Sequence, residues 1–299
     1  MNRFRESIKL YIPPIILVGA RKIRLRLAGK RPSPDFEGPY STWQDAAANA
    51  AGWDAPAILG KTLDLSLKIR DGLIEFQQDL VEYGRIRYSE TIIAFLAMAS
   101  GMNDGKLDIV DFGGSLGTNF AQNRKLLRPF VDGGKCHWII IERPPTVDLG
   151  RKHFSDQSLR FFATLDELKA QCDQVPTSFL FSGSMQYIEE PFTLLDQIIE
   201  GGMNLVAFDR LFVSTKKQHQ IFIQHHRATY PTWCFSRNLF VETMSSKGFV
   251  LVEEFSFPPG EQFDYHRGPD GPLYSCGMIF AREKANSRLN RLSRDTTGS

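Results

Sequence analysis

The feature that most constrains this sequence is the stretch from residue 107 to residue 117, LDIVDFGGSLG. Apolar side chains surround Asp111, three glycines then fall within five residues, and a helical pattern begins at Thr118. A buried strand that breaks into a glycine-rich turn and then a helix directs unpaired backbone N–H groups to one point. We therefore expect this turn to bind a nucleotide or a carboxylate ligand.

The order of elements after residue 107 predicts the fold class. Strand patterns alternate with helical patterns, and a last helix is followed by two strands with no helix between them. Parallel strands need crossover helices, whereas consecutive strands joined by a loop can pair antiparallel. We predict an α/β fold, namely a doubly wound, Rossmann-like, seven-stranded sheet with a terminal antiparallel strand. The predicted strands are 107–112, 137–142, 159–162, 178–182, 204–208, 249–255 and 274–281.

The chain divides into four predicted segments. They are a basic and apolar arm at 1–35, a helical cap at 36–102, the main domain at 103–283 and a disordered tail at 284–299. Residues 1–31 hold nine Lys or Arg and one acidic residue. The apolar run within them is shorter than the ~20 residues of a membrane-spanning helix. We interpret the arm as packing on the domain or as a peripheral membrane contact.

Composition indicates the cellular compartment of the protein more clearly than its function. The net charge of +2 gives no reason to expect a nucleic-acid partner. Four cysteines lie scattered without a CxxC pair, so neither a zinc site nor a disulfide framework is predicted, and a reducing, cytoplasmic setting is favoured. His219, His225 and His226 lack the i, i+4 spacing of a helical metal site. We predict no metal site and a solvated face there, although one of these histidines could act as a general base.

The glycine turn fits one cofactor class better than another. A dinucleotide fingerprint needs a third glycine inside the helix, and Thr118 occupies that place. The run from Asp111 to Gly117 instead resembles the first motif of class I S-adenosylmethionine-dependent methyltransferases, acidic–apolar–Gly–x–Gly–x–Gly. Ser115 departs from that motif because it stands where the middle glycine usually lies, and its Cβ limits the backbone conformations of the turn.

This resemblance implies S-adenosylmethionine as the cofactor. Glu142 ends the second strand, where the superfamily places the carboxylate that accepts both ribose hydroxyls, and residues 179–191 look like its fourth motif. Thr164 and Leu165 follow the third strand, where adenine packs, although simple filling of the loop is an alternative. Bracing of the turn is the alternative role for Asp111. The implied cofactor-binding residues are Asp111, Gly113, Gly114, Ser115, Gly117, Glu142, Thr164, Leu165, Ser182, Gly183 and Ser184.

Nearly the whole chain is similar to a family of methyltransferases encoded with bacterial surface-polysaccharide genes. The matching segments are 12–14, 36–43, 51–59, 111–114, 182–187, 209–210 and 230–236. The similarity implies a small-molecule or glycan acceptor and a role in polysaccharide biosynthesis. The candidate substrate-pocket residues are Tyr187, Asp209, Arg210, Tyr230 and Trp233.

Two other functions remain open at this point. One is a non-catalytic protein that binds a nucleotide or a partner through the same fold, at a membrane. The other is a nicotinamide-dependent sugar oxidoreductase. The sequence identifies no catalytic base.

Overall fold

The computed structural model describes most of the chain. The described residues are 36–50, 56–78, 80–172, 174–225, 228–256, 265–268 and 271–285. The predicted arm at 1–35 lies outside them, and so does the predicted tail from residue 286 onward.

Five parallel strands form the centre of the main sheet. They are β4 (Leu107–Phe112), β5 (Cys136–Ile141), β6 (Leu159–Phe162), β7 (Ser178–Ser182) and β8 (Leu205–Ser214). Their spatial order is β6-β5-β4-β7-β8, so the order reverses between β4 and β7. In an open α/β sheet the crevice at the carboxyl ends of the strands, at such a reversal, is where ligands bind. The glycine turn after β4 lies at this point.

The last strand, β13 (Gly271–Arg282), runs antiparallel to β8 and also pairs antiparallel with β11 (Phe249–Ser256). These seven strands confirm the predicted doubly wound sheet with a terminal antiparallel strand. β13 is last in the chain, but in space it lies between β8 and β11.

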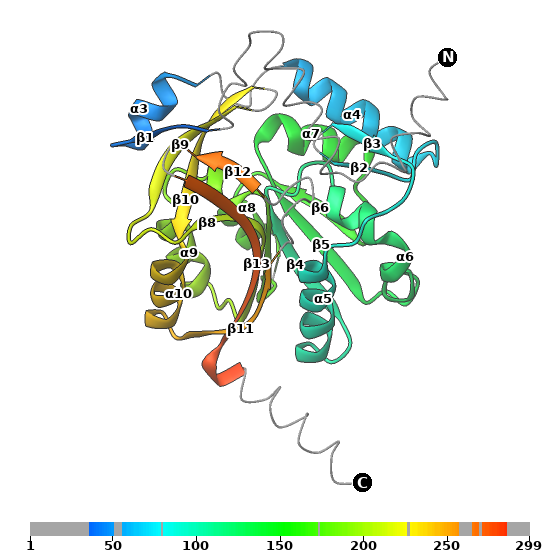
Figure 1. The fold of residues 1–299 in the computed structure, drawn as a ribbon. Helices are drawn as coiled ribbons and strands as arrows, with labels where there is room; N and C mark the ends of the chain where they lie inside the picture. Colours follow the sequence, from blue (N-terminus) through cyan, green and yellow to red (C-terminus); the bar gives the residue numbers. More distant parts are fainter. Residues whose placement is uncertain are drawn as a thin grey trace, which may run out of the picture.

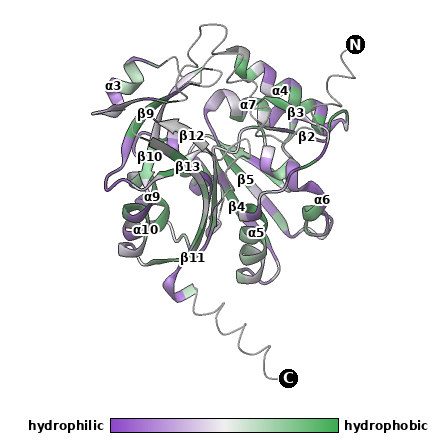
Figure 2. Ribbon diagram, in the orientation of Figure 1, coloured by the Kyte–Doolittle hydropathy of each residue, from purple (hydrophilic) through white to green (hydrophobic). Residues whose placement is uncertain are grey.

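Helices cover both faces of this sheet (Figure 1). On one face pack α5 (Glu90–Met102), α6 (Thr118–Asp132) and α7 (Pro144–His153), and on the other α8 (Leu165–Gln171), α9 (Pro191–Glu200) and α10 (Arg237–Ser246). Neighbouring residues of one strand enter opposite cores: Ile109 joins the first and Val110 the second. Because both faces are buried, the central strands are mainly apolar, and green predominates along them in Figure 2.

The sheet is larger than the sequence predicted. The sequence pattern of segment 215–230 predicts an insertion or an irregular cover, but the segment contributes β9 (Gln220–His225) and the start of β10 (Thr229–Ser236). β10 joins β8 through a short parallel contact, and β1 (Phe36–Tyr40) pairs with β9. With β12 (Tyr265–Gly268) on β13, the described sheet has eleven strands. Residues Ile221 to Ile223 are all buried, so β9 shows no alternation that a strand prediction could use.

The segment 36–102 contains strands as well as helices. Besides β1 and α5 it holds α3 (Trp43–Ala48), α4 (Pro56–Arg70), β2 (Phe76–Gln78) and β3 (Val81–Tyr83). The sequence pattern predicts a helix over 73–81, and this prediction is wrong. β2 and β3 form an antiparallel pair there, in which Phe76 stacks on Tyr83. Leu80 turns the chain there with a positive φ of 62°. Among the described residues, no helix combines the length and apolar character needed to cross a membrane.

Candidate ligand site at the ends of β4, β5 and β7

The turn after β4 uses left-handed backbone at alternate residues. Gly113, Ser115 and Gly117 have φ values of 73°, 54° and 82°. Gly117 then caps α6 without a side-chain hydrogen bond. Two of these positions carry glycine, which adopts positive φ without strain, and Ser115 adopts it as an L-residue. The turn therefore has left-handed backbone at the three alternate positions of the predicted motif, and the backbone of Ser115 is strained there.

Close contacts explain why two of the glycines cannot carry a side chain. A Cβ at Gly113 would lie 2.6 Å from the Cβ of Ser184, and a Cβ at Gly114 would lie 2.7 Å from the Asp111 carboxyl. The Ser184 hydroxyl in turn donates a 2.5 Å hydrogen bond to the carbonyl of Phe112. The loops after β4 and β7 are thus packed against each other at the topological reversal.

Asp111 lies beneath the glycine turn and braces it. Its side chain is 0% exposed and accepts hydrogen bonds from Asn119 Nδ2 at 3.1 Å and Trp138 Nε1 at 3.2 Å. Burial raises the pKa of Asp111 to about 7, and the two hydrogen bonds oppose that rise. The structure thus supports the bracing alternative, while keeping the carboxyl directly under Gly114.

Glu142 stands beside the turn at the end of β5. Its Oε1 accepts a 3.2 Å hydrogen bond from the backbone N–H of Ser115, and its Oε2 accepts one of 2.9 Å from the N–H of Arg143. Burial raises the pKa of Glu142 above its usual value. A carboxylate offers about four acceptor positions, so this group can hold the turn and still accept hydroxyl donors from a ligand.

Asp209 is a buried carboxylate in the middle of β8, where it pairs with Ser182 at the end of β7. It is 2% exposed and accepts 2.7 Å hydrogen bonds from the hydroxyls of Ser89 and Ser182. Arg210 Nε lies 3.5 Å from Asp209 Oδ2. The pair is therefore not a surface salt bridge. It joins β8 to β7 and to Ser89, whose side chain caps α5.

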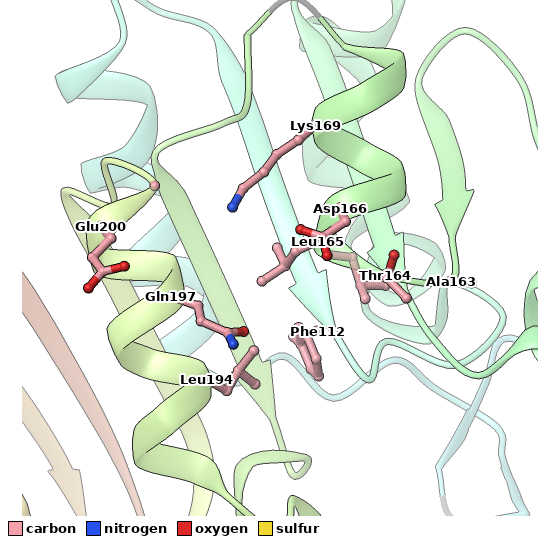
Figure 3. Close-up of a pocket in the computed structure, with 11 residues that line it drawn as sticks. Phe112, Ala163, Thr164, Leu165, Asp166, Lys169, Leu194, Gln197 and Glu200 are labelled. Carbon is pink, nitrogen blue, oxygen red and sulfur yellow. The ribbon is translucent and has the colours of Figure 1, made fainter.

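Thr164 and Leu165 line a groove between α8 and α9, on the face of the sheet next to this crevice (Figure 3). The Thr164 hydroxyl caps α8 by accepting from the N–H of Glu167 at 3.0 Å. The groove has a volume of about 500 Å³, a size typical of small-molecule sites. Its lining residues are Phe112, Ile141, Ala163, Thr164, Leu165, Asp166, Lys169, Leu194, Gln197, Glu200 and Gly201.

Three of the predicted substrate-pocket residues are engaged in packing. Tyr187 donates to Gln224 and packs edge-to-face on Tyr230, which is 2% exposed. The Trp233 indole stacks on Trp43 from α3, and its N–H donates to the carbonyl of Ile188 at 3.1 Å. These side chains fix β10 and α3 beside the short helix η1 (Met185–Tyr187) rather than converging with the glycine turn.

The histidines separate in the structure. His219 Nδ1 accepts a hydrogen bond from the N–H of Ser236 at 2.9 Å, so its neutral ring carries the proton on Nε2 and has no lone pair for a general base. Burial lowers the pKa of His219. His225 pairs with Glu37 at 3.0 Å, and His226 lies outside the described residues. The described part of the chain holds no group of three or more metal-ligating side chains.

Sequence reasoning missed three residues that build this site: Asn119, Trp138 and Ser89 in its role at Asp209. Asn119 could have been found from its place in the first turn of the helix after the glycines. Trp138 and Ser89 reach their partners through the register of β5 on β4 and the packing of α5, for which a single sequence carries no signal.

Comparisons with known proteins give distant similarities. No protein-family model and no curated protein matches the sequence. A 1,6-didemethyltoxoflavin-N1-methyltransferase from Burkholderia thailandensis, solved with S-adenosylhomocysteine, is similar at 15% identity, covering 78% of this chain and 94% of its own, with a TM-score of 0.39. A Galdieria sulphuraria protein assigned as a sarcosine dimethylglycine methyltransferase is similar at 12% identity, covering 74% and 98%, with a TM-score of 0.46.

The CcbJ methyltransferase from Streptomyces caelestis is similar at 13% identity, covering 62% of this chain and 88% of its own, with a TM-score of 0.36. At identities of 12 to 15% and TM-scores below 0.5, these similarities assign no reaction to this chain. Its fold class follows from its own strand order.

Proposed function

We propose that this protein is an S-adenosylmethionine-dependent methyltransferase that acts on a small-molecule or glycan acceptor. One observation carries the proposal: at the topological reversal, a turn of alternate left-handed residues is hydrogen-bonded to an acidic side chain at the end of the neighbouring strand. Ser115 and Glu142 are these partners. Backbone N–H groups beside a carboxylate suit a ligand that brings both hydroxyl donors and an anionic end.

The chain's residues fit such a cofactor in three ways. Gly113 and Gly114 let Ser184 and the Asp111 carboxyl pack closely against the turn and fix its backbone, and Glu142 has acceptor capacity for ribose hydroxyls. Thr164 and Leu165 line the α8–α9 groove, and in this proposal the purine ring packs against them. When bound, the cofactor supplies an electrophilic methyl group on a sulfonium.

The protein's own contribution to such a reaction is orientation. The loops after β4 and β7 are packed against each other, and the buried Asp209 connects β8 to β7 and to Ser89. Holding two reactants in line removes most of the entropic barrier to a bimolecular transfer. In this proposal the acceptor approaches beside η1, near Tyr187 and Arg210, and surface-polysaccharide biosynthesis supplies it. His219 is not the base for an oxygen acceptor, because its only lone pair is occupied.

Calorimetry with S-adenosylhomocysteine and with NADH tests the cofactor. We expect S-adenosylhomocysteine to bind and NADH not to bind. Glu142→Gln should weaken binding by roughly 10- to 100-fold, the effect of removing a charged acceptor. Asp132→Asn is the matched control, because this carboxylate is exposed at the end of α6 and pairs with Arg128.

The other two binding results would each indicate a different function. Binding of NADH alone would replace the proposal with a nicotinamide-dependent oxidoreductase, and binding of neither ligand would leave a non-catalytic scaffold. If the parent binds S-adenosylhomocysteine, the acceptor can be sought by comparing surface glycans from a deletion strain and its parent. A methyl group missing from one sugar in the deletion strain would identify the acceptor.

A further inference from the structure

A β-bulge lies on the strand that carries Asp209 and Arg210. In the pairing of β8 with β13, Leu211 faces Cys276 and Phe208 faces Met278, so Asp209 and Arg210 together oppose the single residue Gly277. Arg210 has a φ of 55°. This left-handed position in a bulge is normally taken by glycine, and bulges next to active sites re-aim side chains.

The bulge brings a guanidinium to the crevice. Neighbouring residues of a regular strand point to opposite faces, yet here both Asp209 and Arg210 reach Ser182: Asp209 accepts from its hydroxyl, and Arg210 Nη2 donates to its carbonyl at 3.2 Å. The surroundings hold the strained backbone in place, because Gln186 Nε2 donates to the Arg210 carbonyl at 3.2 Å. Strain of this kind persists where neighbours over-determine it, and it concentrates at functional sites.

The guanidinium lies flat against the loop after β7. A Cβ at Gly183 would lie 2.9 Å from Arg210 Nη2, so glycine is required for this approach. The same loop contacts the glycine turn through Ser184 and Phe112. The charge of Arg210 also reaches beneath the turn, where it lowers the pKa of Asp111 against the larger effect of burial. About a quarter of the Arg210 side chain remains exposed.

We propose that Arg210 binds the carboxylate at the amino-acid end of the cofactor. This inference rests on the proposed function, and it states in which direction the cofactor lies across the site. Glu142 follows β5 and Gly183 follows β7, with β4 between them, a separation of roughly 10 Å at normal strand spacing. S-adenosylmethionine has hydroxyls at its ribose and a carboxylate at the far end of a short chain, which matches an acceptor at Glu142 and a cation over Gly183.

The test compares two ligands that differ only in the amino-acid end. S-adenosylhomocysteine carries the carboxylate, and 5′-methylthioadenosine lacks it. We expect Arg210→Gln to weaken S-adenosylhomocysteine binding by roughly 10- to 100-fold, the effect of losing a charge-assisted hydrogen bond, and to leave 5′-methylthioadenosine binding unchanged. Arg210→Lys keeps a point charge without the planar guanidinium, so its affinity for S-adenosylhomocysteine should lie between those of the parent and Arg210→Gln. Arg128→Gln removes an exposed arginine of α6 and should change neither affinity.

The outcomes separate the two proposals. Unchanged S-adenosylhomocysteine affinity in Arg210→Gln overturns the assignment while leaving the cofactor in place. Equal weakening of both ligands also overturns it, because Arg210 would then be a structural brace for Asp209. If Arg210→Gln does not fold, the ratio of the two affinities in Arg210→Lys decides, and an unchanged ratio counts against the assignment. A parent protein that binds neither ligand defeats the proposed function, and this inference with it.

Discussion

Close packing of α5 on β13 supports the bulge at Asp209 and Arg210, and a substitution at Gly277 tests this packing. Gly277 lies opposite the bulge, and an ideal Cβ there would be 1.8 Å from Thr91 Oγ1 and 2.9 Å from Thr91 Cβ. Unstrained contacts between such atoms lie at roughly 3.5–4.0 Å, so Gly277→Ala would force α5 off the sheet by more than about 1 Å. Overpacking of this size should lower the free energy of unfolding by about 3 kcal/mol.

Thr91 cannot simply turn away from the new methyl group. Its Cβ would itself lie 2.9 Å from the new methyl group, and rotation about χ1 does not move that atom. Its hydroxyl is buried and makes no hydrogen bond among the described residues. Thr91→Ala therefore removes a methyl group and an unsatisfied hydroxyl together, and we expect a change within about 1 kcal/mol. In the double variant the worst overlap is gone, so the two substitutions should couple by about 1–2 kcal/mol.

Urea unfolding followed by tryptophan fluorescence and circular dichroism measures all four proteins of this cycle. Gly101→Ala is the control on the same helix, because a Cβ there meets nothing within 4 Å, and it should stabilise by about 0.5–1 kcal/mol. Displacing α5 also pulls Ser89 from Asp209, so Gly277→Ala should weaken S-adenosylhomocysteine binding as well. A loss below about 1 kcal/mol, or strict additivity in the cycle, would refute the close-packing argument.

Three further substitutions test the site and its supports. Ser115→Gly relieves a left-handed L-residue and should raise the unfolding free energy by up to about 1 kcal/mol in urea melts while keeping the N–H bonded to Glu142. The pKa of Asp111, 3.8 unfolded and about 7 folded, makes its stabilising contribution complete below pH 4 and lost by pH 7, so the parent should lose on the order of 3 kcal/mol between pH 5 and 8. Asp111→Asn should remove that loss, and an identical pH profile would count against the assignment. Gly150→Ala places a Cβ 2.4 Å from the Phe161 ring and should destabilise by about 2–3 kcal/mol, measured by thermal melting.

The central strands could be predicted closely because their physics is local. The spans 107–112, 159–162 and 178–182 agree with β4, β6 and β7 to the residue. Each is a short, mainly apolar run with glycine, serine or a charged residue at one or both ends, and burial on both faces removes any need for polar alternation. The antiparallel last strand followed from the missing crossover helix.

The strands at the margin of the sheet depend on distant partners. β1 exists because it pairs with β9, far along the chain, and Phe36 fills a cluster with Phe212 and Phe222. No pattern within residues 36–40 reveals that partner. Pairing energy from another segment decides such strands, so a reading of local propensity misses them.

The candidate site divides in the same way. The turn at 113–117 could be predicted from the sequence, because glycines at this spacing allow the left-handed backbone that the turn needs. The burial of Asp111 was not visible, since it depends on Asn119 from α6 and Trp138 from β5 meeting at one carboxyl. The bulge at Arg210 is a mismatch of register between β8 and β13, and register belongs to a pair of strands rather than to either sequence.

Asp209 connects two of the predicted segments, 36–102 and 103–283, through its hydrogen bonds. Its donors come from three elements: Ser89 before α5, Ser182 at the end of β7, and Arg210 in its own strand. α5 also buries Ile92 and Phe95 in the core beneath the central sheet. Removing the Ser89 hydroxyl would leave this buried carboxylate with one hydrogen bond fewer, at a cost of about 1.5–3 kcal/mol. We therefore infer that the end of segment 36–102 folds together with the domain that follows it, because the residue that caps α5 also holds a buried side chain of β8.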